Sequence, residues 1–76
     1  MSAATDLRVR AARATLEQRL FARPEVRLVD IARERPAGVV VLRVHLAAGA
    51  DDRALGIPEE VDGIPVRIVP ANHRPA

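Results

Sequence analysis

The sequence has no cysteine, tryptophan or tyrosine, and Phe21 is its only aromatic residue. Without cysteine the chain can form neither disulfides nor thiolate metal sites, and nothing points to an oxidising compartment. Folding must then depend on hydrophobic packing, which is limited in a chain of 76 residues. The hydrophobic residues, 49% of the total, are almost all Val, Leu, Ile and Ala. We therefore expect one small domain, ordered over about residues 5–70, with a thin aliphatic core.

Long hydrophobic runs are also absent. Residues 1–14 contain no apolar run of secretory length, and no later run approaches the roughly 20 residues of a membrane span. The sequence thus gives no reason to expect a membrane partner, and a cytoplasmic location is the default expectation.

Lysine is missing too, so all twelve basic residues are arginine, against ten acidic residues, for a net charge of +2. The pI near 11.0 arises because almost nothing titrates between neutral pH and the guanidinium range. Residues 1–44 hold nine Arg and five acidic residues, whereas residues 45–76 hold three and five. An anionic partner would therefore bind the N-terminal half.

Residues 5–23 are rich in helix formers and lack Gly and Pro, which predicts one amphipathic helix. Thr5 is the expected N-cap, Asp6 suits the positive end of the helix dipole, and Pro24 ends the helix. At 100° per residue one apolar stripe faces the core, formed by Val9, Ala12, Leu16 and Leu20. A weaker stripe lies nearly opposite, formed by Leu7, Ala11, Ala14 and Phe21. It reflects either the small size of alanine and a frayed end, or a second contact surface.

Two β-rich runs flank the turn-forming residues 35–38, which predicts a hairpin over residues 25–47. If Glu34 faces Val39, one face becomes continuously apolar, with Val29, Ile31, Val40, Leu42, Val44 and Leu46. The helix would cover this face. The opposite face would be mixed, with Leu28 opposite His45, Asp30 opposite Arg43, Ala32 opposite Val41, and Val39 at the loop end.

The remaining residues predict a short helix, a turn and a third strand. Asp51 and Asp52 begin the helix and Gly56 ends it. Asp62 and Gly63 form the turn, and the strand alternates as Ile64, Val66 and Ile68, with Pro65 at an edge or just before pairing begins. Residues 71–76 predict a flexible tail.

The element order α-β-β-α-β gives an α/β fold of the α+β two-layer type. Its mixed sheet would have three strands, and a right-handed crossover would place the long and the short helix on one face.

Groups able to carry chemistry are scarce. The hydroxyl side chains are Ser2, Thr5 and Thr15, none on a strained turn of the G-x-S-x-G type. His45 could be oriented by Asp30, but Arg43 is the better partner for that carboxylate, and His73 lies in the tail. The acidic clusters at 51–52 and 59–62 lack Ca²⁺-loop spacing, and the single glycines form no phosphate-binding loop. We expect no catalytic residue, no metal site and no cofactor.

The segment Ile57-Pro58-Glu59-Glu60-Val61-Asp62-Gly63-Ile64-Pro65-Val66 resembles an element of small bacterial α/β modules that occur alone or ahead of a trypsin-like domain. The resemblance covers about residues 7–70 and concerns structural motifs. Asp30 and Ala32 depart from it, because such modules often place glycines there. The chain has no room for a protease domain, so no catalytic residue carries over, and the resemblance implies a topology and no activity.

Two functions follow as hypotheses. A two-layer fold with one uncovered sheet face predicts a non-enzymatic interaction or assembly module that pairs with a second copy or another protein. Its interface would contain Leu28, Val39, Val41, His45 and Phe21. The alternative is an arginine-mediated binder of nucleic acid or another polyanion, through Arg8, Arg13 and Arg27.

Overall fold

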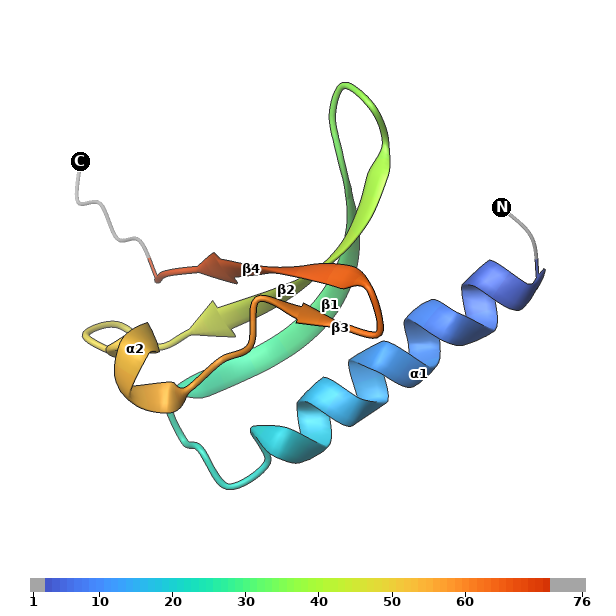
Figure 1. Ribbon diagram of the computed structural model, residues 1–76. Helices are drawn as coiled ribbons and strands as arrows, with labels where there is room; N and C mark the ends of the chain where they lie inside the picture. Colours follow the sequence, from blue (N-terminus) through green and yellow to red (C-terminus); the bar gives the residue numbers. More distant parts are fainter. Residues whose placement is uncertain (1–2, 72–76) are drawn as a thin grey trace.

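The computed structural model describes residues 3–71, which form one helical layer packed on one mixed sheet (Figure 1). Its elements are α1 (Ala3–Arg19), β1 (Val26–Glu34), β2 (Val39–Leu46), α2 (Asp52–Leu55), β3 (Glu60–Val61) and β4 (Ile64–Val69). The sheet order is β1-β2-β4-β3. The α+β class is confirmed, but the sheet has four strands where the sequence predicted three.

The apolar stripe of α1 is buried as predicted, because Val9, Ala12, Leu16 and Leu20 form one side of the core. The ends of the helix differ from the prediction. Thr5 lies inside the helix and is not its N-cap, since an alanine-rich start lets the helix begin at Ala3. The helix ends at Arg19, and Phe21 N–H donates to the Gln18 carbonyl in a tighter turn (3.3 Å) that leads to Pro24.

The hairpin register agrees with the prediction at every pair from Leu28–His45 to Glu34–Val39. Alternation therefore places Val29, Leu42, Val44 and Leu46 in the core under α1. One irregularity was not predicted. The pairing shifts between Val26 and Leu28, so Arg27 is an extra residue in a β-bulge.

Strand β4 is parallel to β2, from Leu42–Val66 to His45–Val69, as predicted. The additional strand is β3, which pairs antiparallel with the start of β4. Asp62 and Gly63 join them in a two-residue turn with positive φ at both positions (52° and 79°), the geometry that an Asp-Gly pair favours. Pro65 lies opposite Glu60 in this pair, before the pairing with β2 begins.

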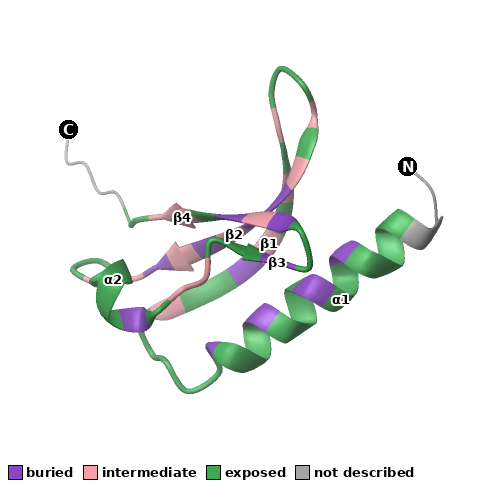
Figure 2. Cartoon of the chain, viewed as in Figure 1, coloured by how far each residue is buried: buried purple, intermediate pink, exposed green. Residues whose placement is uncertain are grey.

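The short helix α2 is capped as its sequence suggests. The Asp51 carboxylate accepts a hydrogen bond from Arg53 N–H (3.0 Å), and Gly56 ends the helix with φ of 64°. Leu55 is buried in the same core as α1, so both helices lie on one face of the sheet (Figure 2).

Within residues 3–71, no helix is long and apolar enough to cross a membrane. Of the tail expected over residues 71–76, residues 72–76, which include His73, lie outside the described part of the chain.

Candidate interaction surface

The face of the sheet opposite α1 and α2 is the outer face, and no described helix or loop packs over it (Figure 1). Alternation along the strands places three kinds of side chain there. Leu28 and Val39 are apolar and partly exposed, Val41 is apolar and buried, and Asp30, Glu34, Arg43, His45 and Arg67 are polar.

Two doubly hydrogen-bonded ion pairs cross the outer face. Arg43 donates to Asp30 from Nε (2.9 Å) and Nη2 (2.8 Å), linking β2 to β1. Arg67 donates to Glu34 from Nε (2.7 Å) and Nη2 (2.9 Å), linking β4 to β1. Each arginine holds the pKa of its carboxylate below the ordinary value, mainly through these hydrogen bonds. The prediction that Asp30 pairs with Arg43 is thus confirmed.

His45 lies beside the first pair. Its Nε2 is 3.2 Å from Asp30 Oδ2, but the N–H direction does not meet hydrogen-bond geometry, so the nitrogen is buried without a hydrogen-bond partner. The contact makes a smaller contribution than Arg43 to the lowered pKa of Asp30. His45 therefore lies beside an ion pair in which both carboxylate oxygens of Asp30 already accept hydrogen bonds from Arg43.

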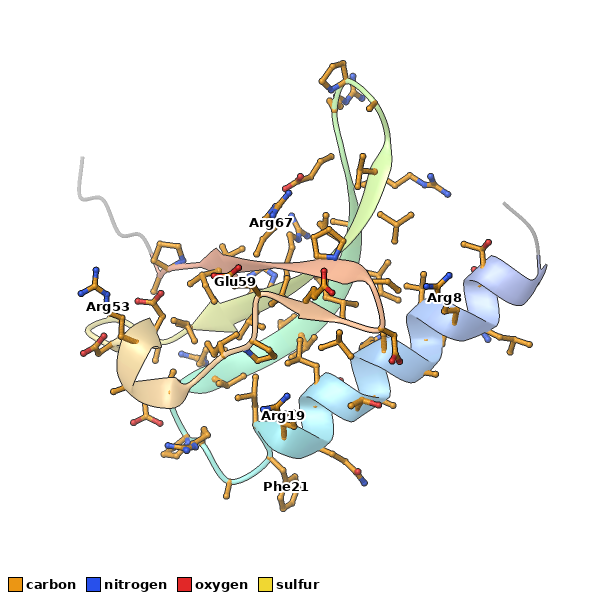
Figure 3. All side chains as sticks on the ribbon, viewed as in Figure 1. Arg8, Arg19, Phe21, Arg53, Glu59 and Arg67 are labelled. Carbon is orange, nitrogen blue, oxygen red and sulfur yellow. The ribbon has the colours of Figure 1, made fainter. Side chains whose placement is uncertain are left out.

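Val41 has an exposed fraction of 0% and is not accessible on this face, contrary to the expectation from the sequence. The reason is the Glu34–Arg67 pair. Because β2 lies between β1 and β4, a bond from Glu34 to Arg67 must cross over β2. Glu34 is level with Val39 and Arg67 with Arg43, so the pair passes over Val41 between them. Figure 3 shows Arg67 on the side of the sheet away from α1.

The other expected interface residues do not form one patch with Val41. Leu28 and Val39 lie at opposite ends of the outer face, with the ion pairs between them. Phe21, with 88% of its surface exposed, lies in the turn after α1 and projects away from the fold (Figure 3). Leu28 lies opposite His45, but the structure does not bring Leu28, Val39 and Phe21 together.

Two of the three arginines proposed for polyanion contact are engaged within the chain. Arg8 Nη2 donates to the Asp62 carbonyl (3.1 Å), and Arg13 Nε lies 3.4 Å from Glu17 Oε2. Arg27 occupies the bulge and makes no ion pair with the described residues. These arginines therefore do not present a common free surface.

The free edge of β1 is a feature that the sequence interpretation missed. We use "free edge" for residues 28–34, the regular part of β1 beyond its bulge, because β1 ends the strand order and no described segment pairs with its outer side. Ile31 lies on the α1 side of this strand but α1 leaves 37% of it exposed. A long unpaired edge is a template for pairing with another strand.

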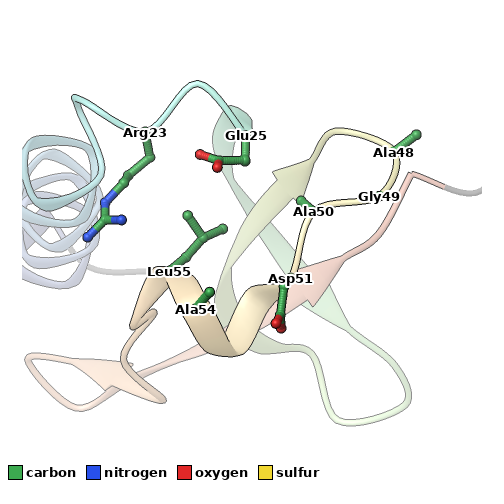
Figure 4. A pocket seen from close by; sticks show the side chains of 8 residues that line it. All are labelled: Arg23, Glu25, Ala48, Gly49, Ala50, Asp51, Ala54 and Leu55. Atoms are coloured by element: carbon green, nitrogen blue, oxygen red, sulfur yellow. The ribbon is translucent and has the colours of Figure 1, made fainter.

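A hollow of about 360 Å³ lies where the turn before β1 meets α2 (Figure 4). Arg23 and Glu25 lie on one side of it, and Leu55 forms part of the opposite wall. Asp51 also lines it, but its carboxylate already caps α2. Charges of both signs surround the hollow, so its lining favours no single class of ligand. Among the described residues, no group of His, Cys, Asp and Glu could hold a metal ion.

No family model matches the chain, and no curated protein or solved structure does so either.

Proposed function

We propose that this chain is a non-enzymatic assembly module that associates with a second copy of itself through its sheet. The observation that carries the proposal is the free edge, residues 28–34 of the nine-residue strand Val26–Glu34, at an open end of the sheet. Natural proteins usually shorten, cover or bend such an edge, since its unpaired backbone groups bind other strands. The strand at the other end of the sheet order, β3, has only two residues.

Protection of β1 is incomplete. The bulge at Arg27 interrupts its beginning, but residues 28–34 run on without proline or a second bulge. Leu28 and Ile31 are exposed on opposite faces of this stretch. A partner strand would bury apolar surface on both faces as well as satisfy the backbone, and apolar burial is the main driving force of association.

The outer face contributes rigidity. Its charged side chains are fixed in doubly hydrogen-bonded pairs, so β1 is linked to β2 and β4 by side chains as well as by the backbone. A strand held in one conformation loses little further freedom when it binds, which favours association. The pairs also neutralise the face, since Asp30 and Glu34 balance Arg43 and Arg67.

The test is the mass in solution, measured by size-exclusion chromatography with light scattering. The proposal predicts a dimer, and predicts that Ile31→Lys gives a folded monomer because a lysine on the edge opposes strand pairing. The matched control is Leu7→Lys, which places the same charge on the exposed side of α1 and should leave the mass unchanged. If the wild-type chain is a monomer at every concentration, the proposal is wrong.

Polyanion binding stands as a second candidate, with a different set of residues. In or near α1, four arginine side chains make no ion pair or hydrogen bond with the described residues, namely those of Arg10, Arg19, Arg23 and Arg27. Replacing all four with glutamine should abolish binding to duplex DNA at about 50 mM salt. Absence of binding by the wild-type chain under that condition would remove this candidate.

A further inference from the structure

We propose that β1 pairs antiparallel with β1 of a second copy, about a twofold axis at Ile31, which passes between the two copies of this residue. The inference rests on the proposed self-association and specifies which surface makes it. The two four-stranded sheets would become one continuous sheet, with α1 of both copies on the same face.

Backbone hydrogen bonds identify the groups that point outward from the edge. The Glu34 carbonyl accepts from Gly38 N–H (2.7 Å), and the Glu25 carbonyl accepts from Ala47 N–H (2.7 Å), so both point toward β2. N–H and C=O groups of successive residues alternate in direction, and the bulge at Arg27 accounts for the change of parity between these two residues. Val29, Ile31 and Arg33 therefore present their backbone groups to the open side.

Symmetry limits the register. Residues directly opposite each other in an antiparallel pair project on the same face of the sheet. A twofold axis between two identical strands must therefore lie between two copies of the same residue, and it cannot place a residue opposite its own chain neighbour. An axis through Ile31 is central to residues 28–34 and uses the whole regular part of the strand. Ile31 then faces Ile31 of the second copy, and both can donate and accept across the axis.

Charge favours the same register. With the axis at Ile31, Leu28 faces Glu34, Val29 faces Arg33 and Asp30 faces Ala32, so within residues 28–34 no charged residue opposes another. With the axis one residue earlier, Asp30 would face Asp30. With the axis one residue later, Asp30 would face Glu34. Like charges directly opposite in a sheet are destabilising, and both neighbouring registers contain such a pair.

The exposure of Ile31 also supports an axis at this residue. Ile31 retains 37% exposure on the face that α1 covers elsewhere, at the one position where the axis would bring it against an identical side chain. Pairing would thus extend the apolar layer of each copy into the other. The arrangement needs no rearrangement of the outer-face ion pairs, because Asp30 and Glu34 keep their partners on β2 and β4.

The absence of cysteine provides a direct test. Ile31→Cys would place two thiols opposite each other, with Cα atoms about 5.5 Å apart, within disulfide range. Arg33→Cys is the matched control, since position 33 would face position 29 and its thiols would be too far apart. Both variants are oxidised mildly in their folded state and analysed on non-reducing gels. Ile31→Cys should form the covalent dimer at least about tenfold faster.

A second measurement uses the wild-type chain and does not depend on a variant. Amide hydrogen exchange at Val29, Ile31 and Arg33 should slow as the protein concentration rises through the association range, while Leu7 on α1 should show no such change. A wild-type dimer in which Ile31→Cys cross-links no faster than Arg33→Cys, and in which these amides remain unprotected, would overturn the register while leaving self-association intact. A wild-type monomer would overturn both.

Discussion

Replacing Val41 with alanine tests whether a side chain on an uncovered sheet face can be part of the core. Val39 provides the comparison, because it lies on the same strand and the same face but retains 46% exposure, against 0% for Val41. Removing two buried methyl groups costs about 1.6 kcal/mol in transfer free energy, and the remaining cavity raises this to about 2 kcal/mol. The same change at Val39 should cost about 0.5 kcal/mol.

The difference in strand propensity between Val and Ala is common to both variants and cancels in the comparison. Unfolding in urea should be followed by far-ultraviolet circular dichroism, since the chain has no Trp or Tyr to report by fluorescence. Combining Val41→Ala with Arg67→Ala should then reduce the cost of Val41→Ala, because loss of the Glu34–Arg67 pair already exposes the valine. Equal costs at Val39 and Val41 would refute the conclusion that the ion pair covers Val41.

Two further predictions concern the ion pairs and the β3–β4 turn. Because Arg43 lowers the pKa of Asp30 in the folded state, this carboxylate contributes stability above its ordinary pKa of 3.8 and loses that contribution as the pH falls through the lower folded pKa. Urea unfolding from pH 7 down to about pH 2 should therefore show a shallower acid limb for Asp30→Asn than for the wild type, and parallel limbs would contradict this. Gly63→Ala should lower the free energy of unfolding by about 1–2 kcal/mol, since φ is 79° and the new Cβ would lie 3.2 Å from Arg8 Nη2. Gly49→Ala has a similar φ of 82°, but no atom lies within 4 Å of the new Cβ, so it should lower the free energy of unfolding by less. Thermal unfolding of both variants gives the comparison, and an equal loss would show that the Arg8 contact is unimportant.

Local pattern was sufficient to predict most of the fold. One face of the hairpin becomes continuously apolar only if Glu34 faces Val39, and this requirement alone fixed the hairpin register. The spacing of Val9, Ala12, Leu16 and Leu20 likewise identified the buried stripe of α1. Strand β3 was missed because two residues, Glu60–Val61, are too few to show alternation.

The properties of the surface were harder to predict, because they depend on contacts distant in the chain. Burial of Val41 requires Arg67 to reach Glu34 across two strand boundaries, and that depends on the register of β4, which no local signal gives. Exposure of Ile31 likewise depends on where α1 stops covering the sheet. An alternating strand alone cannot distinguish a covered apolar residue from an exposed one.

The measurement that tests the central claim most directly is the light-scattering mass of the wild-type chain over a range of concentrations around 100 µM, repeated at about 0.5 M salt. Pairing through the free edge predicts twice the chain mass of 8.2 kDa, at low and at high salt, because backbone hydrogen bonds and apolar contacts are little screened. A mass of 8.2 kDa at every concentration and salt would contradict it.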